Sequence, residues 1–189
     1  MTVTPSHEHT VLRSQDHIVL QIAEIPTPLG TMLAGATSDG ICLLEFVDSK
    51  RIEKQLGRLR KLLNGEIFPG TNDLIARLAT QMEEYFTGTR REFDLPLVVP
   101  GTVFQKSVWE ALRTIPYGET VSYQAEAEMI GRPTAVRAVA RANGANPISI
   151  IIPCHRVIGK NGKLTGYGGG LWRKQRLLDH ERQYTGLSR

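Results

Sequence analysis

Two short helical patterns joined by a tight turn constrain the fold of this 189-residue chain more than any other feature. The first pattern covers residues 122–130, and the second covers residues 134–143. Gly131-Arg-Pro133 lies between them, and both glycine and proline favour a turn at this point. Two helices joined by a short turn that contains glycine form a helix-turn-helix. We therefore expect this motif in the second half of the chain.

Other patterns of the second half predict two further helices and a strand. Thr102 and Gln105 have the spacing of a capping box, which indicates that a helix begins after Thr102. Residues 148–152 are rich in isoleucine and predict a buried strand that ends close to Cys154. A last helix is expected over residues 172–182.

The first half has a different character. Residues 17–46 alternate apolar and polar side chains between turn signals, which predicts short antiparallel strands joined by hairpins. Apolar residues then recur at helical spacing over residues 52–63 and 74–85. Residues 95–101 contain two prolines and are interpreted as a linker. No residue of this half points to catalysis.

These elements together predict the α+β class and a division into domains. We expect a flexible tail over residues 1–16 and an N-terminal α/β domain, with a small antiparallel sheet and helices, over residues 17–95. The mostly helical C-terminal domain, which contains the helix-turn-helix, is expected over residues 101–189.

Composition excludes several classes of protein. The chain has only two cysteines, Cys42 and Cys154, too few for a disulfide framework or a four-thiolate zinc site, and we expect no metal. Cys42 lies in an apolar segment and is expected to be a small buried hydrophobic residue of the core. The apolar runs fall short of the roughly 18 residues that span a membrane, and residues 1–16 lack the apolar stretch of a signal peptide. We therefore expect a soluble, cytoplasmic protein.

Positive charge is concentrated in the second half. Residues 1–100 carry 10 Lys/Arg against 13 Asp/Glu, a net charge of −3, whereas residues 101–189 carry 13 against 6, a net charge of +7. A basic region of this kind is typical of a domain that faces nucleic acid, although a merely solvated basic surface explains the charge equally well. Arg137 and Arg141 share one face of the second helix of the motif with small alanines, which favours close approach to a DNA backbone.

Cys154 is followed directly by His155 and Arg156. A thiol attacks as the thiolate, so a reactive cysteine needs a base or a positive charge nearby, and these two neighbours can supply both. On Pro-Cys-His-Arg alone, a buried inert cysteine is the default interpretation. Glu181 lies on the inward side of the last predicted helix, where a carboxylate needs a partner, and His155 is the obvious candidate.

A series of motifs covers residues 101–189. They are Phe-Gln-x-x-Val-Trp at 104–109, Ile-Pro-Tyr-Gly-Glu-Thr at 115–120, Ser-Tyr at 122–123, Arg-Ala-Val at 137–139, Asn-Gly-Ala-Asn-Pro at 143–147, Ile-Pro-Cys-His-Arg-Val at 152–157, Thr-Gly-Tyr-Gly-Gly-Gly at 165–170 and Leu-Leu-Asp-His-Glu at 177–181. Through these motifs the chain resembles the O6-alkylguanine-DNA alkyltransferases, and the first half fits the less distinctive α/β domain of that family. No cluster of zinc-binding cysteines precedes it, so the resemblance is to the stand-alone bacterial type.

The resemblance implies DNA repair by direct reversal, in which one alkyl group passes from O6-alkylguanine to Cys154 after base flipping. His155 would deprotonate the thiol through a water molecule, because adjacent residues of the predicted strand point to opposite faces, and Glu181 would orient His155. Asn146 would hold the turn before the cysteine, and Tyr123 would hydrogen-bond the guanine and assist departure of its oxygen. Further DNA contacts are expected from Arg137, which would replace the flipped base, and from Thr134, Ala135, Ala138 and Arg141.

The same resemblance implies a substrate pocket completed by Val157, Tyr167, Gly168 and Gly169. Gly168 stands where some family members carry a serine, so the range of alkyl groups and the repair of O4-alkylthymine stay open. The thioether product is not hydrolysed, which implies a methyltransferase that acts once, as a suicide enzyme without a cofactor. The expected partner is double-stranded DNA, bound in the minor groove by a monomer, with cooperative binding left open.

Three alternatives give some of the same residues other roles. Cys154, His155 and Asn146 superficially match a cysteine hydrolase, but that hypothesis leaves the basic helix unexplained. A DNA-binding protein that only senses alkylated bases is the stronger alternative, although proteins of that kind replace the nucleophilic cysteine. A transcriptional regulator would use the helix-turn-helix and leave the cysteine segment and the glycine-rich loop without a function.

Overall fold

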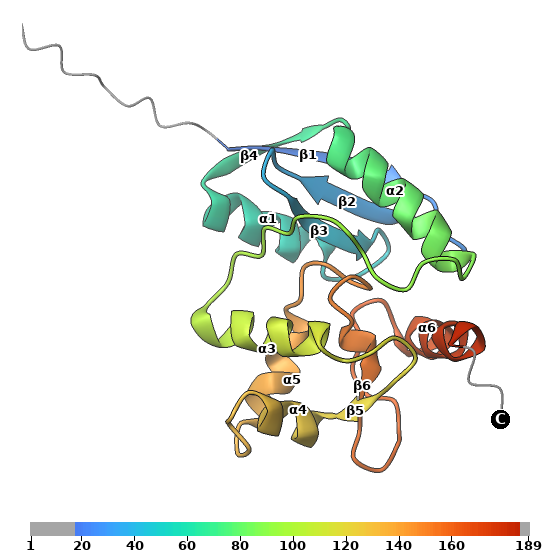
Figure 1. Ribbon diagram of the computed structural model, residues 1–189. Coiled ribbons are helices and arrows are strands. Elements are labelled where there is room, and N and C mark those ends of the chain that lie inside the picture. Colours follow the sequence, from blue (N-terminus) through green and yellow to red (C-terminus); the bar gives the residue numbers. More distant parts are fainter. Residues whose placement is uncertain (1–17, 186–189) are drawn as a thin grey trace, which may run out of the picture.

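The computed structural model describes residues 18–185, and the predicted tail over residues 1–16 lies outside this range. Figure 1 shows a sheet with two flanking helices stacked on a mostly helical body. The predicted α+β class is therefore confirmed. Among the helices between residues 18 and 185, none is both long and apolar enough to cross a lipid bilayer.

Four strands form the N-terminal sheet, in the order β3-β2-β1-β4. Antiparallel pairing joins β1 (Ile18–Ile25), β2 (Met32–Ala36) and β3 (Ile41–Phe46), as the alternation of the sequence predicts. The fourth strand, β4 (Gly65–Pro69), pairs in parallel with β1, so the expectation of a purely antiparallel sheet was wrong. The glycine and proline at the ends of β4 are turn signals, and its five residues are too few to show the period of a strand.

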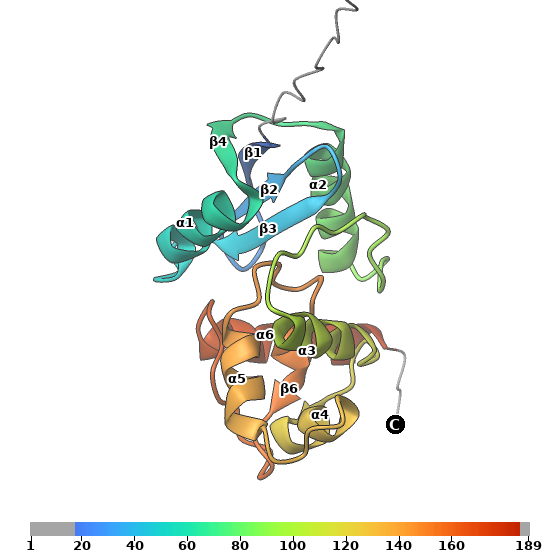
Figure 2. The ribbon, with the colours of Figure 1, turned by 90° about the vertical axis from the view of Figure 1, so that its left-hand side faces the viewer.

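Helices α1 (Ile52–Leu63) and α2 (Asp73–Phe86) lie on opposite sides of the sheet, as Figure 2 shows. The α1 residue Leu59 packs into a small core that contains Cys42, whereas the α2 residue Met82 packs into the larger core. Cys42 is fully buried, as predicted, and burial raises the pKa of its thiol to about 12. Nothing in its surroundings favours the thiolate enough to make it reactive at neutral pH.

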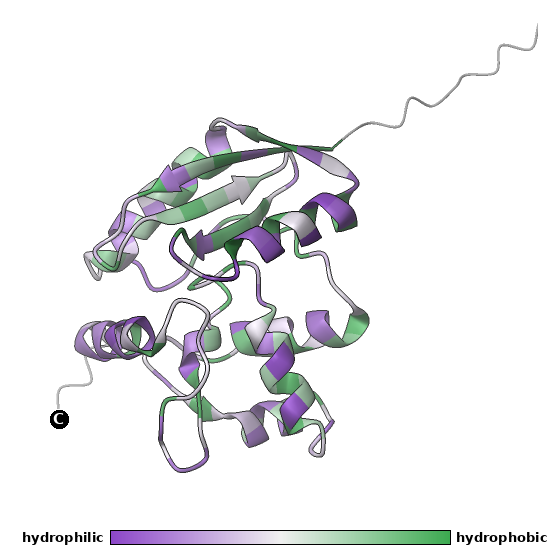
Figure 3. Ribbon diagram, turned by 180° about the vertical axis from the view of Figure 1, so that it is seen from behind, coloured by the Kyte–Doolittle hydropathy of each residue, from purple (hydrophilic) through white to green (hydrophobic). Residues whose placement is uncertain are grey.

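The C-terminal body is built from α3 (Val103–Arg113), α4 (Tyr123–Met129), α5 (Val136–Gly144) and α6 (Leu171–Tyr184). The predicted capping box is present at the start of α3, where Thr102 caps the backbone of the first turn. Helices α4 and α5 pack on each other and on α3, which confirms the helix-turn-helix pair. Figure 3 shows that α6 is hydrophilic along most of its length.

Residues 148–152 do not form the strand that their isoleucines predict. Ile148 makes a single bridge to Leu44 of β3, and Ile150 has a φ of 72°. The N–H of Ile152 donates to the carbonyl of Ile148 at 3.0 Å, which closes a turn. Most of the segment is buried between the sheet and the helices. The apolar run therefore reflects burial and not an extended backbone.

This turn leads directly into a 3₁₀ helix over Cys154–Arg156. The next residues form β6 (Val157–Ile158), which pairs in parallel with β5 (Val121–Ser122). Because α4 begins immediately after β5, this two-stranded ladder holds the first turn of α4 beside the cysteine.

The predicted linker over residues 95–101 lies along β3. The N–H of Ile41 donates to the carbonyl of Pro96, and the N–H of Val98 donates to the carbonyl of Ile41, both at 2.9 Å. One continuous hydrophobic core extends from the sheet through residues 148–152 to α3 and α6. The domain boundaries given above stay predictions.

Candidate active site

A pocket of about 500 Å³ opens between α5, the start of α4 and the glycine-rich loop around residues 165–168. Cys154 lies in its wall and has 7% of its surface exposed. A volume of this size is typical of a site that holds a small molecule or a single planar group. The residues that the sequence predicts and that line this pocket are Tyr123, Arg137, Cys154, Tyr167 and Gly168.

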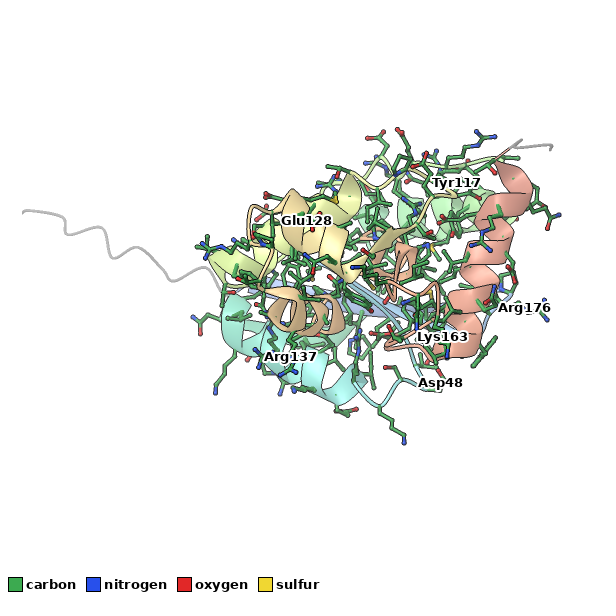
Figure 4. The ribbon with its side chains drawn as sticks, turned by 90° about the horizontal axis from the view of Figure 1, so that it is seen from below. Asp48, Tyr117, Glu128, Arg137, Lys163 and Arg176 are labelled. Atoms are coloured by element: carbon green, nitrogen blue, oxygen red, sulfur yellow. The ribbon has the colours of Figure 1, made fainter. Side chains whose placement is uncertain are left out.

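The other predicted site residues lie around this pocket without lining it. Asn146 is buried behind the cysteine, and Val157 and Gly169 are buried in β6 and in the glycine-rich loop. Arg137 extends from α5 on the face that Figure 4 shows. Exposed or partly exposed positions on and just before the same helix are occupied by Thr134, Ala135, Ala138 and Arg141.

Asn146 connects the cysteine to the turn that precedes it. Its Nδ2 atom donates to the Sγ atom of Cys154 at 3.3 Å and to the carbonyl of Ile152 at 2.8 Å. Its Oδ1 atom accepts from the N–H of Ile148 at 3.0 Å. Burial raises the pKa of the Cys154 thiol, and the Asn146 hydrogen bond opposes this shift. The thiol is therefore protonated at rest and must lose its proton to react.

His155 and Glu181 form a buried pair, as the sequence predicts. The distance between His155 Nε2 and Glu181 Oε1 is 2.7 Å, and both side chains are fully buried. Glu181 also accepts from Arg156 through Nε at 2.9 Å and Nη2 at 3.0 Å, and from the Tyr85 hydroxyl and the Gly118 N–H, both at 2.9 Å. Burial favours the neutral acid, but the contacts with His155 and Arg156 outweigh it and hold the pKa of Glu181 well below its ordinary value.

This pair fixes the state of the imidazole. An ionised Glu181 can only accept, so Nε2 of His155 carries a proton, and burial lowers the pKa of the ring, which keeps it neutral. The other nitrogen, Nδ1, is then an acceptor, and it is buried without a hydrogen-bond partner among residues 18–185. His155 thus offers one free basic nitrogen next in sequence to the cysteine. Arg156 is engaged with Glu181 and so does not supply the expected positive charge beside the thiol.

Comparison with known proteins places this arrangement in a family. Residues 103–183 match the DNA binding domain of 6-O-methylguanine DNA methyltransferase, and residues 22–99 match its ribonuclease-like domain. The chain is 44% identical to a methylated-DNA–protein-cysteine methyltransferase of Mycolicibacterium paratuberculosis over 90% of this chain and 97% of the relative. The chain belongs to the 6-O-methylguanine DNA methyltransferase family.

Similar structures agree with this assignment. The O6-methylguanine methyltransferase of Mycobacterium tuberculosis is 40% identical, with a TM-score of 0.75 over 89% of this chain and 96% of that one. The same mycobacterial protein in complex with DNA gives 41% identity and a TM-score of 0.75, over 88% and 94% of the two chains. A relative from Methanosarcina barkeri is 48% identical over 83% of this chain and 94% of its own length.

The N-terminal half of this methyltransferase-family chain contributes to the site, although the sequence pointed to no functional residue there. Arg51, just before α1, donates from Nη1 to the carbonyl of Gly144 at 2.6 Å and forms a salt bridge with the buried Glu45 of β3. The Arg51 side chain also lines the pocket, and its charge opposes the rise that burial causes in the pKa of Cys154. The sequence signal that could have revealed this contact is Glu45, a charged residue inside the apolar run over residues 41–46, which needs a partner when buried.

Lys174 of α6 was also missed. It is fully buried, and its ammonium group donates to the carbonyls of Val157 at 2.6 Å, Thr165 at 2.7 Å and Gly166 at 3.2 Å. Burial lowers its pKa to about 8. Because Tyr123 donates to the same Thr165 carbonyl at 3.1 Å, these contacts hold the glycine-rich loop against α4. Lys174 lies seven residues before Glu181, on the same inward side of α6, and this spacing could have revealed it.

The structure gives a physical reason for the glycine at position 168. A Cβ atom added to Gly168 would collide with the guanidinium of Arg51. A serine at this position therefore requires the Arg51 side chain to move, and Gly168 leaves the space that Arg51 occupies beside the pocket.

Proposed function

We propose that this protein repairs DNA by direct reversal, transferring one alkyl group from the O6 atom of guanine to Sγ of Cys154. The observation that carries the proposal is a cysteine in the wall of a base-sized pocket, backed by the buried His155–Glu181 pair. The membership of the chain in a methyltransferase family, and relatives named for this reaction, support the same conclusion.

The bond changes define what the residues must do. The S–C bond forms as the C–O bond of the lesion breaks, the thiol loses a proton, and the released guanine gains one. The thioether that results has no leaving group that water displaces at a useful rate. Each molecule therefore acts once, irreversibly, and needs no cofactor for this step.

His155 is proposed to remove the thiol proton through one water molecule. Glu181 holds the proton on Nε2, so Nδ1 is the only basic position that the ring offers. The charged imidazole that forms is then stabilised by the ionised Glu181 at 2.7 Å. A strand at Cys154 would place the side chains of Cys154 and His155 on opposite faces and so require a water between them, but these residues form a 3₁₀ helix. The unpartnered Nδ1 atom supports the relay instead.

Tyr123 and Asn146 are proposed to assist the same step. Tyr123 lines the pocket at the first residue of α4, where its hydroxyl can contact the guanine as the charge on the leaving oxygen develops. Asn146 already donates to the sulfur and keeps the turn before Cys154 closed. Tyr167 and Gly168 complete the pocket wall, with Val157 and Gly169 behind it.

DNA is proposed to bind across α5, on the face shown in Figure 4. A base inside a duplex cannot reach a cysteine that is 93% buried, so the lesion must be flipped out of the stack. Arg137 lies at the pocket mouth, where it can fill the gap that the flipped base leaves. The small side chains of Ala135 and Ala138 suit the narrow minor groove, and Thr134 and Arg141 are placed to contact phosphates. A monomeric state and a cytoplasmic location stay predictions.

Repair requires a reactive Cys154, whereas mere sensing of the lesion requires only binding. We expect Cys154→Ser to lose transfer from duplex DNA that contains O6-methylguanine, while its affinity for that duplex stays within about twofold of the wild type. Gel-shift or fluorescence titration beside a transfer assay measures both quantities. A wild type that binds the lesion tightly and never transfers the methyl group would make the protein a sensor.

A further inference from the structure

Glu126 is a fully buried carboxyl group that the proposed relay does not use. It lies on α4, inside the helix-turn-helix, and accepts from Nδ2 of Asn143 on α5 at 2.6 Å. The other carboxyl oxygen of Glu126, Oε1, and the single side-chain oxygen of Asn143, Oδ1, are both buried and have no hydrogen-bond partner among the described residues. One hydrogen bond and two unpaired oxygens therefore occur in the same pair of side chains.

An ionised Glu126 leaves this pair unsatisfied. A carboxylate and an amide oxygen are both acceptors, so neither unpaired oxygen can serve the other, and leaving each of them buried without a donor is unfavourable. A neutral carboxylic acid carries one O–H donor. With the proton on Oε1, Glu126 can donate to Oδ1 of Asn143 while Oε2 still accepts from Nδ2. A single proton shared in this way would satisfy both orphaned oxygens and add a second hydrogen bond to the one observed.

The surroundings favour the neutral form. Burial raises the pKa of Glu126 to about 7, opposed by the Asn143 hydrogen bond and by the charge of Lys174 on α6. Lys174 is held by three backbone carbonyls. Tyr123 on α4 itself donates to a carbonyl of the glycine-rich loop. From α3, Val108, Trp109 and Leu112 point inward, and the charged residues of that helix are exposed.

We propose that Glu126 is a positioning residue for alkyl transfer, because as a neutral acid it forms a paired acid–amide contact with Asn143 that fixes α4 against α5. Ionisation of Glu126 breaks one of the two hydrogen bonds and places a charge between the helices. The role in transfer rests on the proposed function. The two helices carry facing walls of the pocket, with Tyr123 on α4 and Arg137 and Asn143 on α5. The acid–amide contact therefore joins the two helices that carry those walls.

The contact itself is tested without any repair assay. Protein labelled with ¹³C at the glutamate carboxyl carbons is titrated by NMR, with Glu126→Gln to assign the Glu126 signal. We expect one signal to titrate with a midpoint near 7, well above the ordinary glutamate value of 4.5, and to vanish in Glu126→Gln. A Glu126 signal that titrates near its ordinary value of 4.5 would overturn the acid–amide contact.

Its role in the reaction is tested by the pH dependence of transfer. Glu126→Gln replaces the acid by an amide that can make the same two hydrogen bonds and cannot ionise. Between about pH 6 and pH 8 the protonated fraction of the wild-type residue falls about tenfold, so the rate ratio of Glu126→Gln to wild type should rise up to about tenfold. Ionisation of the thiol is common to both proteins and cancels in the ratio.

Glu128→Gln is the matched control, because Glu128 is an exposed glutamate on the same helix and is labelled in Figure 4. Its rate ratio to wild type should stay flat over the same range. A flat ratio for Glu126→Gln would overturn the positioning role even if the NMR midpoint is raised. If the wild type transfers no alkyl group at all, the proposed function fails and takes this role with it, whereas the titration still decides the contact.

The pH dependence of the free energy of unfolding gives a second test for the proton on Glu126. The folded-state pKa of Glu126 lies above its ordinary value of 4.5, so its stabilising contribution is complete below pH 4.5 and is lost as pH rises through about 7. The free energy of unfolding of Glu126→Gln minus that of the wild type should therefore increase between pH 4.5 and about pH 7. Above this range the difference should stay constant. A constant difference from pH 4 to 8 would contradict the inference.

Discussion

The two cysteines of this chain are both buried, yet their surroundings differ completely. Cys42 lies in the small core between the sheet and α1, where its thiol donates to the carbonyl of Gly35 at 3.5 Å among leucines. Cys154 borders a pocket, receives a hydrogen bond from Asn146 and precedes a histidine with a free basic nitrogen. Burial raises the pKa of both thiols. The acidity of the resting thiol therefore does not distinguish the two cysteines. What distinguishes them is that Cys154 borders a pocket and has a basic nitrogen nearby, whereas Cys42 has neither.

The largest expected effect separates the two thiols directly. Cys154→Ser should reduce methyl transfer from duplex DNA below detection, because a neutral hydroxyl is a far weaker nucleophile than a thiolate. Cys42→Ser is the matched control and should transfer one methyl group at a rate within about twofold of wild type. Radiolabelled methyl transfer measures both variants. Loss of transfer in Cys42→Ser with the fold intact would break the comparison.

The next largest effect is expected when Glu181, which orients the base His155, is replaced. Glu181→Gln should slow transfer by about a hundredfold, the range typical of a general base that loses its orientation and its stabilised charged form. The same change leaves Arg156 buried without its carboxylate, which should also lower the free energy of unfolding by about 3–5 kcal/mol. Single-turnover transfer under conditions where the variant is folded, checked by circular dichroism, measures the first effect.

Asp179→Asn is the control for that experiment, since Asp179 is an exposed carboxylate on the same helix. It should match the wild type in rate and in stability. An unchanged rate in Glu181→Gln would remove the relay from the account and leave the cysteine to be activated by other groups, such as Arg51 and Lys174.

A smaller effect is expected from the residue at the mouth of the pocket. Arg137→Ala should lower the rate of transfer from duplex DNA by about tenfold, because flipping an alkylated base costs a few kcal/mol that Arg137 helps to offset. Transfer from free O6-benzylguanine needs no flipping and should change by less than about twofold. Arg113→Ala removes an exposed arginine at the end of α3 and should leave both rates unaltered. Equal losses with both substrates would contradict the role of Arg137.

The smallest effect concerns the fold alone. Cys42→Ala leaves a small cavity in the core beside Leu20 and Leu59, and should lower the free energy of unfolding by about 1 kcal/mol. Urea unfolding followed by tryptophan fluorescence measures the change, and the transfer rate serves as the control. A destabilisation with no loss of transfer would sharpen the distinction between a structural and a reactive thiol.

The elements with strong periodicity were predictable from the sequence. The helix-turn-helix, the capping box at Thr102 and the antiparallel strands over residues 17–46 follow from local patterns, and the structure contains all three. The contact between Glu181 and His155 also followed, because an inward carboxylate on α6 needed a partner. Each of these inferences depends on spacing within one segment or on the cost of burying a charge.

The elements that failed depend on contacts between distant segments. Residues 148–152 are apolar because they fill the space between the sheet and the helices, and sequence pattern alone cannot distinguish this from a strand. Strand β4 is a strand only because it pairs with β1. The first pair of that ladder, Ile18 with Gly65, joins residues forty-seven positions apart in the sequence. Arg51 and Lys174 reach the site from opposite halves of the chain, so no local motif connects them to Cys154.

The most direct test of the account is the intact mass of the protein after incubation with excess duplex DNA that carries O6-methylguanine, followed by peptide mapping. The account predicts a gain of one methyl group, located on Cys154, with Cys42 unmodified and no further gain however much DNA is added. Continued turnover of DNA without a mass change, or a methyl group on any residue other than Cys154, would contradict it.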